Sequence, residues 1–269
     1  MDHQNDIHDS GITASVDRRD QIMTRLLENK RVSVSRLATD LSVSEATVRR
    51  DLRRLATEGD VQIVHGGATL APQVDYSFQA KSRRNPASKQ IIGRLAAEMV
   101  SDGDHLFVDS GTTCLHMAPQ LRIRKQLSII ATSLRLAAEL TAPSTTVVLL
   151  GGHFRPTRMD TIGPLAINSL DQLRGYTAFI GADGLSPDFG PSASDMESAH
   201  LHQIVVRNAQ GTVLLADSSK FEGPSLYRIA AWDHIQKVIT ESPPNESWCD
   251  FFQENSIELI HPPKATQHA

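Results

Sequence analysis

The sequence predicts a two-domain α/β chain, with a small, mainly helical amino-terminal domain and a larger domain built on a mostly parallel sheet. Two observations lead to this prediction. Short helical patterns and a glycine-rich turn fill the first 70 residues, whereas apolar strand patterns alternate with helical ones from about residue 89 onward. With 269 residues, the chain is long enough for two hydrophobic cores.

Two short helical patterns, joined by a tight Ser-Val turn, lie between residues 33 and 55. Ser33 and Ser44 each precede an apolar-periodic run, where a serine hydroxyl can accept a hydrogen bond from an unpaired helix N–H. Apolar residues recur at helical spacing in both runs, at Val34, Leu37, Ala38 and Leu41 and then at Val48, Leu52 and Leu55. The opposite face of the second helix carries Ala46, Arg49, Arg50, Arg53 and Arg54.

This cationic face predicts a helix that binds the major groove of DNA. Because such a helix reads bases with its amino-terminal half, we expect two groups of contacts. The bases would be contacted by Ala46, Thr47 and Arg50, and the phosphates by Ser44, Arg49 and Arg53. Glu45 stands where the helix dipole favours a carboxylate. The alternative is a solvated arginine face, with Asp51 paired to some of the arginines.

The flanking patterns complete a small domain over residues 15–70. Upstream, Asp17 could cap a helix with apolar positions at Ile22, Met23, Leu26 and Leu27. Downstream, Gly59 ends the second helix of the pair, and the turn Gly66-Gly67 predicts a hairpin whose apolar residues are Val61 and Ile63. Three helices and a hairpin make a winged helix-turn-helix, in which Ser33 and His65 are further candidates for DNA contact.

The segment VSVSRLATDLSVSEATVRRDLRRLATEG, followed by VHGGA, resembles the amino-terminal domain of DeoR-type bacterial transcriptional regulators. The run TVRRDL, the spacing to Gly59 and the HGGA wing occur in the family's order. The resemblance implies that double-stranded operator DNA is a partner. The family often has an arginine two residues before the wing histidine, where this chain has Ile63. This departure shifts more of the recognition onto Arg49, Arg50 and Arg53.

Composition favours a cytoplasmic protein. The net charge of −4 is uneven, because residues 1–90 hold 14 basic and 12 acidic residues and residues 91–269 hold 13 and 19. Cys114 and Cys249 form no disulfide framework or metal-ligand spacing, which favours a reducing compartment, and we expect no cofactor. No apolar run approaches the roughly 18 residues of a membrane span. Residues 1–14 are polar, and we expect a disordered tail there rather than a secretory signal.

Residues 71–88 lack a clear periodic pattern and are interpreted as an interdomain linker. They contain Pro72 and the basic stretch 81–86, which is a solvated segment or, alternatively, a contact to the DNA backbone. A second domain is expected over residues 89–263. Its strand candidates are residues 106–108, 127–131, 147–150, 178–180, 213–216, 238–239 and 257–260. Helical patterns lie between several of them, at Ile92, Leu95, Ala96 and Met99 and over residues 134–140 and 194–208.

Polar clusters follow several of these strands, where the carboxyl ends of a parallel sheet collect ligands. Asp109-Ser110-Gly111-Thr112-Thr113 comes after the first strand, and backbone N–H groups at the following helix start can hold a phosphate or simply be capped. The other clusters are residues 151–152, 181–184 and 217–221. Lys220 could place a charge on a phosphate and Asp183 could accept sugar hydroxyls, although each could also be a surface turn residue.

The order DSGTT, ATS, LLGG, FIGADG and LADSSKF resembles the effector domain of DeoR-type regulators. That domain is similar to sugar-phosphate isomerases of the ribose-5-phosphate isomerase type and typically senses a phosphorylated sugar. The resemblance implies a phosphate held by Ser110, Gly111, Thr112 and Thr113, in a pocket that Asp109, Asp183 and Lys220 complete. Further candidates for the effector pocket are Lys89, Ser133, Gly152 and Glu197.

Two departures bear on the identity of the effector. The family's usual Thr-Asn-Ser after the second strand is Ala131-Thr132-Ser133 here, so a hydroxyl replaces an amide. The segment 191–200 also differs from the commoner versions. Within it we expect Asp195 to cap the following helix, while Glu197 either contacts sugar hydroxyls or only charges the helix start.

The sequence therefore predicts a repressor of a carbohydrate catabolic operon, whose DNA binding is controlled by a phosphorylated sugar or a related metabolite. We expect it to form a homo-oligomer, either a dimer or a tetramer. An isomerase-like enzyme with an appended DNA-binding domain is the alternative, since Asp183, Glu197 and Lys220 could transfer protons. No defensible acid–base pair, nucleophile motif or metal motif supports it. A protein-interaction module is a third hypothesis, and it predicts no salt-dependent affinity for DNA.

Overall fold

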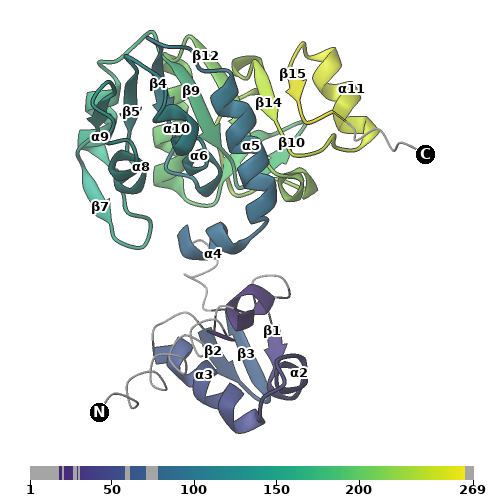
Figure 1. The fold of residues 1–269 in the computed structure, drawn as a ribbon. Helices are drawn as coiled ribbons and strands as arrows, with labels where there is room; N and C mark the ends of the chain where they lie inside the picture. The colour runs from purple at the N-terminus through teal and green to yellow at the C-terminus, as the bar shows by residue number, and fades with distance from the viewer. Residues whose placement is uncertain are drawn as a thin grey trace, which may run out of the picture. The chain divides into compact units, whose positions relative to one another are not determined.

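The computed structural model describes residues 18–19, 21–26, 29, 31–57, 61–70 and 78–263, which belong to two compact units (Figure 1). The first unit covers Met1–Arg84 and the second covers Asn85–Ala269. Each unit has a hydrophobic core of its own, as the length of the chain led us to expect.

The amino-terminal unit is a winged helix-turn-helix. Residues 18–19, 21–26 and 29 are helical, and they precede β1 (Arg31–Ser33), α2 (Val34–Asp40) and α3 (Glu45–Thr57). The wing consists of β2 (Val61–Val64) and β3 (Gly67–Leu70), and the antiparallel sheet has the order β1-β3-β2. The core is formed by the apolar faces of the helices, because the predicted stripe Val48, Leu52 and Leu55 is buried against Ile22 and Leu26.

The structure adds elements that sequence reasoning missed. Strand β1 is only three residues long and ends at the serine that caps α2, so its pattern is hidden in the helix start. Within the segment interpreted as a linker, α4 covers Phe78–Arg83 and α5 begins at Pro86. Proline suits the first turn of a helix because the N–H that it lacks has no intrahelical acceptor there. The expected roles of Asp17, Leu27, Gly59 and Pro72 lie outside the described residues.

The carboxyl-terminal unit is built on a seven-stranded sheet in which every neighbouring pair of strands is parallel. The strands, in chain order, are β4 (His105–Val108), β5 (Ser128–Ala131), β6 (Thr146–Leu149), β9 (Thr177–Gly181), β12 (Gly211–Leu215), β14 (Lys237–Ile239) and β15 (Glu258–Ile260). Their order in the sheet is β15-β14-β12-β9-β4-β5-β6. These are the seven strands that the sequence predicts, so the α/β fold class is confirmed.

Helices cover both faces of this sheet, and each face has its own apolar cluster. One cluster includes residues of α5 (Pro86–Glu98), α6 (Thr112–Leu115), α7 (Ala118–Leu121) and α8 (Leu134–Glu139). Of these helices, α5 and α6 lie in front of the strands in Figure 1. The other cluster includes residues of α9 (Pro164–Leu170), α10 (Met196–Asn208) and α11 (Glu246–Glu254).

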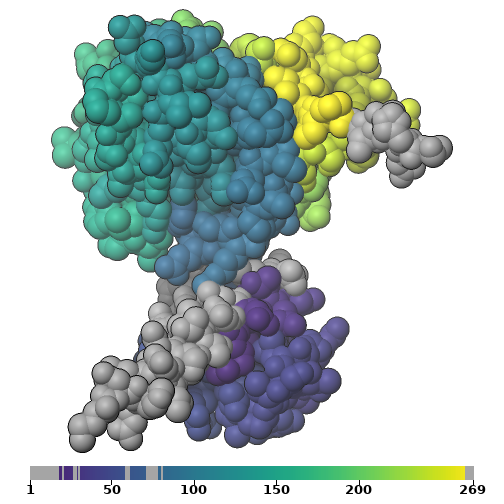
Figure 2. Space-filling model, viewed as in Figure 1, coloured from purple at the N-terminus to yellow at the C-terminus, as the bar shows by residue number. Residues whose placement is uncertain are grey.

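Short accessory strands extend from the sheet. They form the hairpin β7 (His153–Arg155) with β8 (Asp160–Ile162), and a three-stranded antiparallel sheet of β10 (Gly184–Ser186), β11 (Gly190–Ala193) and β13 (Tyr227–Arg228). Two short 3₁₀ helices, η1 (Ser218–Glu222) and η2 (Trp232–His234), follow β12 and β13. At the β15 edge of the sheet, α11 and β15 lie on the surface of this unit, in yellow in Figure 2.

Candidate functional site

The amino-terminal end of α3 is fixed by serine capping, as the sequence predicts. Ser44 Oγ accepts a hydrogen bond from the Thr47 backbone N–H at 3.2 Å and lies 2.9 Å from Thr47 Oγ1. Ser33 caps α2 in the same way, accepting from the Arg36 N–H at 3.2 Å. These caps satisfy backbone donors that the helices themselves leave unpaired, and they fix where each helix starts.

The arginines of α3 differ in whether their charge is already paired. Arg49 forms an ion pair with Glu45 one turn earlier, at 2.7 Å. Arg50 and Arg53 are exposed and have no ion pair among the described residues. Within the part of the chain that the structure describes, their guanidinium groups can therefore bind an external anion. The side chain of Ala46 is exposed as well.

Asp51 does not neutralise these arginines. It is buried on the inner side of α3, and its carboxylate accepts from Arg18 at 2.6 and 3.3 Å. This hydrogen bond raises the pKa of Arg18 despite its partial desolvation. Asp51 therefore pairs with Arg18 rather than with the outward arginines, and Arg50 and Arg53 keep exposed side chains.

In the carboxyl-terminal unit, Asp109 is the buried first residue of the polar segment 109–113 that follows β4. Its carboxylate lies 2.8 Å from His202 Nε2 of α10 and accepts from the Gly181 N–H, at the end of the adjacent β9, at 3.2 Å. Burial would raise the pKa of Asp109, but the facing His202 and the backbone N–H groups lower it. Burial would likewise lower the pKa of His202, but Asp109 above all raises it. The two groups thus form a buried ion pair.

The segment after Asp109 has the geometry of an anion cradle. Gly111 is the extended residue before α6, and the first N–H groups of that helix, at Thr112 and Thr113, have no intrahelical acceptor. A Cβ atom on Gly111 would lie 2.9 Å from Asp109 Oδ2, so a larger residue here would have to displace this buried carboxylate. The unpaired N–H groups can bind a phosphate oxygen.

Ser110 is tied to a buried ionic network that sequence reasoning missed. Its Oγ donates to Asp160 Oδ2 at 2.9 Å, and Asp160 is only 1% exposed. Arg155 holds the same carboxylate with two hydrogen bonds, of 2.8 and 2.7 Å. Because the Ser110 proton is engaged by Asp160, its side chain presents lone pairs rather than a donor to the cradle.

The network continues to the amino terminus of α10. Asp195 caps this helix by accepting from the Ser198 N–H at 2.8 Å, which confirms its predicted role. Its carboxylate also binds Arg155 at 3.1 Å and Arg158 at 2.6 Å. Burial would raise the pKa of Asp195, but Arg158, Ser198 and Arg155 lower it. The two arginines come from the hairpin after Gly152, a strand end that the sequence did single out.

Several predicted pocket residues hold the backbone of the strand ends. Ser133 is buried and caps α8, accepting from the Leu136 N–H at 3.2 Å. A Cβ on Gly152 would lie 2.4 Å from the Ile162 carbonyl oxygen, so this glycine permits close backbone packing. Asp183 accepts from the backbone N–H and the hydroxyl of Ser194, at 2.8 and 2.6 Å.

The two predicted lysines belong to different elements. Lys220 lies in η1, directly after β12, is partly exposed and has no ion pair among the described residues. Lys89 is buried in α5, and its charge adds to desolvation in lowering the pKa of His116. The loop that carries Lys220 begins at Asp217, which is buried and accepts from the Asn85 side chain at 3.0 Å.

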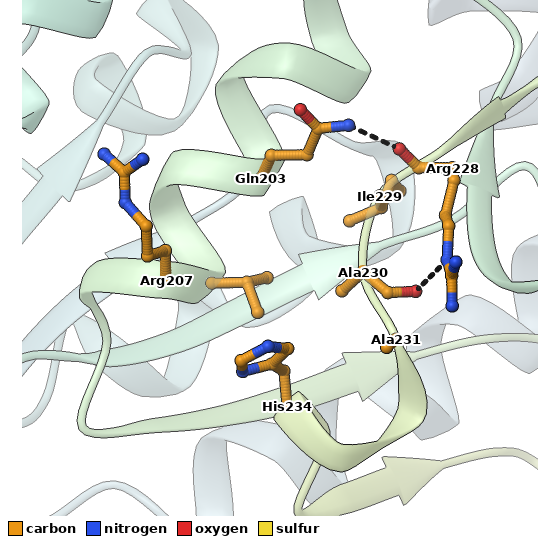
Figure 3. A pocket seen from close by; sticks show the side chains of 8 residues that line it. Gln203, Arg207, Arg228, Ile229, Ala230, Ala231 and His234 are labelled. Atoms are coloured by element: carbon orange, nitrogen blue, oxygen red, sulfur yellow. Dashed lines mark hydrogen bonds between the residues drawn. The ribbon is translucent and has the colours of Figure 1, made fainter.

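Glu197 lies apart from the other predicted pocket residues. Its exposed side chain lines a surface hollow between α10 and β13, with neighbours that include His200, Gln203 and Tyr227. A second hollow on this surface is lined by Gln203, Arg207, Arg228 and His234 (Figure 3). Neither hollow is lined by the residues of the Asp109 cluster.

The described residues contain no group of three or more His, Cys, Asp or Glu side chains placed to hold a metal ion. Within the same residues, none of the helices is long and apolar enough to span a membrane.

Comparisons with known proteins cover both units. Residues 18–74 match the DeoR-like helix-turn-helix domain, and residues 84–242 match the DeoR C terminal sensor domain. The chain is 31% identical to the HTH-type transcriptional repressor GlcR of Bacillus subtilis, over 89% of this chain and 93% of that protein. It is 28% identical to the HTH-type transcriptional repressor CsqR of Escherichia coli, over 91% and 95%. It is 30% identical to the transcriptional repressor AccR of Agrobacterium fabrum, over 84% and 89%.

Among solved structures, ribose 5-phosphate isomerase A of Methanocaldococcus jannaschii is 21% identical, with a TM-score of 0.38 over 51% of this chain and 55% of that one. A likeness this distant says nothing about the activity of the present chain. The relatives matched over nearly their whole length are named as repressors, not as enzymes.

Proposed function

The chain belongs to the DeoR family of transcriptional regulators, and on that premise we propose that it represses a carbohydrate catabolic operon under the control of a phosphorylated sugar. DNA binding is assigned to residues 15–70 and effector binding to residues 89–263. The protein would act in the cytoplasm, where the operator DNA lies. The observation that carries this proposal is that one chain holds both exposed arginines on α3, Arg50 and Arg53, and an anion cradle at the carboxyl ends of β4 and β9.

The contacts on the DNA side follow from which side chains are free. Arg50 lies in the amino-terminal half of α3 and is available to a base edge, where a bidentate arginine contact gives about 1–3 kcal/mol of discrimination. Arg53 lies one turn away and suits a phosphate. Arg49 forms an ion pair with Glu45, so it would contribute less to DNA affinity. Further contacts to DNA would come from the helix starts, through Ser33, Ser44 and Thr47. The wing turn would add His65.

The contacts on the effector side follow from the same reasoning. The phosphate would be held by the backbone N–H groups of Gly111, Thr112 and Thr113, with Lys220 supplying a positive charge. The Ser110 hydroxyl would not donate to the phosphate, because its proton is engaged by Asp160. Asp183, whose carboxylate already accepts from Ser194, would also accept a hydrogen bond from a sugar hydroxyl.

Control of DNA binding by the effector requires that the effector binds the DNA-competent and DNA-incompetent states with different affinity. The coupling free energy is typically about 1–3 kcal/mol. We propose a dimer or tetramer as the DNA-binding species, because a helix-turn-helix protein reads repeated half-sites with two copies. Sedimentation of the full chain, free and bound to operator DNA, measures the number of copies directly.

Two single substitutions separate the sites. Arg50→Ala should abolish operator binding and leave effector binding intact, whereas Lys220→Ala should leave operator binding intact and weaken induction. Thermal shift against a panel of pentose and hexose phosphates identifies the effector, since a ligand of the native state raises apparent stability. Normal induction of the Lys220→Ala protein would refute the assigned pocket, and turnover of a sugar phosphate without DNA binding would refute the regulator.

A further inference from the structure

A hollow of about 670 Å³ lies in the amino-terminal unit, beside β1, the start of α2 and the wing turn. Its lining includes three arginines, Arg25, Arg31 and Arg36, together with His65. No residue of α3 lines it, so this hollow is separate from the arginine face of the recognition helix.

The fold holds the wing turn against the start of α2. The Val34 N–H donates to the Gly66 carbonyl oxygen at 2.9 Å, and β1 pairs with β3 so that Ser33 lies opposite Gly67. A Cβ on Gly67 would lie 1.9 Å from the Val32 carbonyl oxygen, so only glycine allows this approach. His65 is therefore fixed next to the first turn of α2.

The hollow has an excess of positive charge. Arg25 faces the one acidic residue of the lining, Asp40, at 3.6 Å. Arg31 and Arg36 are exposed, and neither has an ion-pair partner among the described residues. Among the described residues, three arginines against one aspartate give the lining a net positive charge, and two of these arginines have no ion pair there.

The wing strand on the other edge of the small sheet has no such charge. Ile63 of β2 is 53% exposed, whereas Arg31 of β1 lies at the opposite edge, across β3. Positive charge beside the wing is therefore supplied by β1 and α2 rather than by the strand before the wing histidine.

We propose that this hollow binds the DNA backbone, with Arg31 and Arg36 each neutralising one phosphate beside those contacted by α3. The inference rests on the proposed DNA-binding function. In helix-turn-helix proteins the helix before the recognition helix crosses the phosphate backbone. Here α2 carries Arg36 in its first turn and directly follows β1, which begins at Arg31. A backbone contact carries no sequence information, so these arginines add affinity without specificity.

The test measures the salt dependence of binding to a mixed-sequence DNA duplex, with full-length protein and fluorescence anisotropy between 50 and 200 mM salt. Each phosphate contact contributes about 0.9 to the slope of log K against log salt. Arg31→Ala and Arg36→Ala should each lower the magnitude of the slope by about 0.9, and the double variant by about 1.8. Each single variant should thus change its affinity ratio to wild type about 3.5-fold across this salt range.

Matched variants distinguish a phosphate contact from a change in folding or net charge. Arg31→Lys and Arg36→Lys keep the charge and should keep the slope. Arg94→Ala removes an exposed arginine of the carboxyl-terminal unit, which pairs with Glu98 of the same helix α5. This variant should also leave the slope unchanged. Arg53→Ala, on α3, should lower the slope as a phosphate contact.

The outcomes separate this inference from the function on which it rests. If Arg53→Ala lowers the slope and the Arg31→Ala/Arg36→Ala double variant does not, the hollow does not face DNA and the inference is wrong. If the Arg94→Ala control lowers it equally, net charge alone explains the effect and the inference is again wrong. If wild-type protein shows no salt-dependent binding, the proposed function fails, and this inference with it.

Discussion

Replacing Arg155 by methionine tests the ionic network beneath the effector cradle. Arg155→Met keeps the aliphatic length of the side chain and removes two hydrogen bonds to Asp160, one to Asp195 and one to Ser198. Asp160 is 1% exposed and would keep the hydrogen bond from the Ser110 hydroxyl and the electrostatic interaction with Arg135, whereas Asp195 keeps Arg158. The dominant loss is therefore the pairing of one buried carboxylate.

Removing one partner of a buried ion pair costs about 3–5 kcal/mol. For a domain of 150–250 residues this corresponds to a fall in Tm of about 6–20 °C. Scanning calorimetry of the full chain should show this fall in the transition of the carboxyl-terminal unit. The matched control is Arg207→Met, because Arg207 is exposed and pairs with Asp171 at 2.7 Å on the surface. Such a surface pair contributes about 0–1 kcal/mol.

Equal falls in Tm for Arg155→Met and Arg207→Met would refute the stabilising role of the buried Arg155–Asp160 pair. The double variant Arg155→Met/Asp160→Asn adds a second criterion. Because it also removes the unpaired charge, it should be more stable than Arg155→Met alone. A double variant less stable than the single one would mean that Arg155 stabilises by packing rather than by pairing with Asp160.

Three further predictions concern the same unit. Gly111→Ala should abolish the thermal shift produced by sugar phosphates, because its Cβ would displace the buried carboxylate below the cradle, whereas Gly151→Ala, with no atom within 4 Å of the added Cβ, should not. The pKa of His202 is raised, so the stability contributed by its protonated form is complete below about pH 6.5 and is lost as the pH rises through that raised pKa. The pKa of Asp109 is lowered, so the stability contributed by its carboxylate is lost only in acid. The free energy of unfolding in urea should therefore fall from pH 6.5 toward alkaline pH, and a His202→Gln protein with the same slope would contradict this. Asn85→Gly permits the left-handed backbone (φ 48°) but removes the side-chain amide that binds Asp217. The free energy of unfolding in urea should therefore fall by about 1–3 kcal/mol. An unchanged free energy would mean that water replaces the lost hydrogen bond.

The seven strands of the parallel sheet could be predicted because each is a short, nearly continuous apolar run, which is what burial on both faces requires. The accessory strands could not. Residues 153–155 and 190–193 are short and partly polar, and they pair only with other accessory segments. Their conformation is set by tertiary packing rather than by a local pattern.

The candidate site divides in the same way. The backbone cradle could be predicted, because a glycine and two hydroxyl residues between a strand and a helix are a local signal. The buried partners could not, since His202 is 93 residues from Asp109 and Asp160 is 50 residues from Ser110. Only the crossover order of the strands brings these pairs together. The helix start at Pro86 was signalled by Asn-Pro, but the neighbouring basic run favoured a linker.

The hydrogen bond between Asn85 and Asp217 has a consequence for building chimeric regulators from this chain. A sensor module cut at residue 89, where the strand and helix patterns begin, would lose Asn85 and the proline that starts α5. Asp217 would then be buried without its amide partner, in the loop that carries Lys220. A module cut immediately before Asn85 retains this partner. Modules exchanged at that junction should keep their ligand response, and those joined four residues later should not.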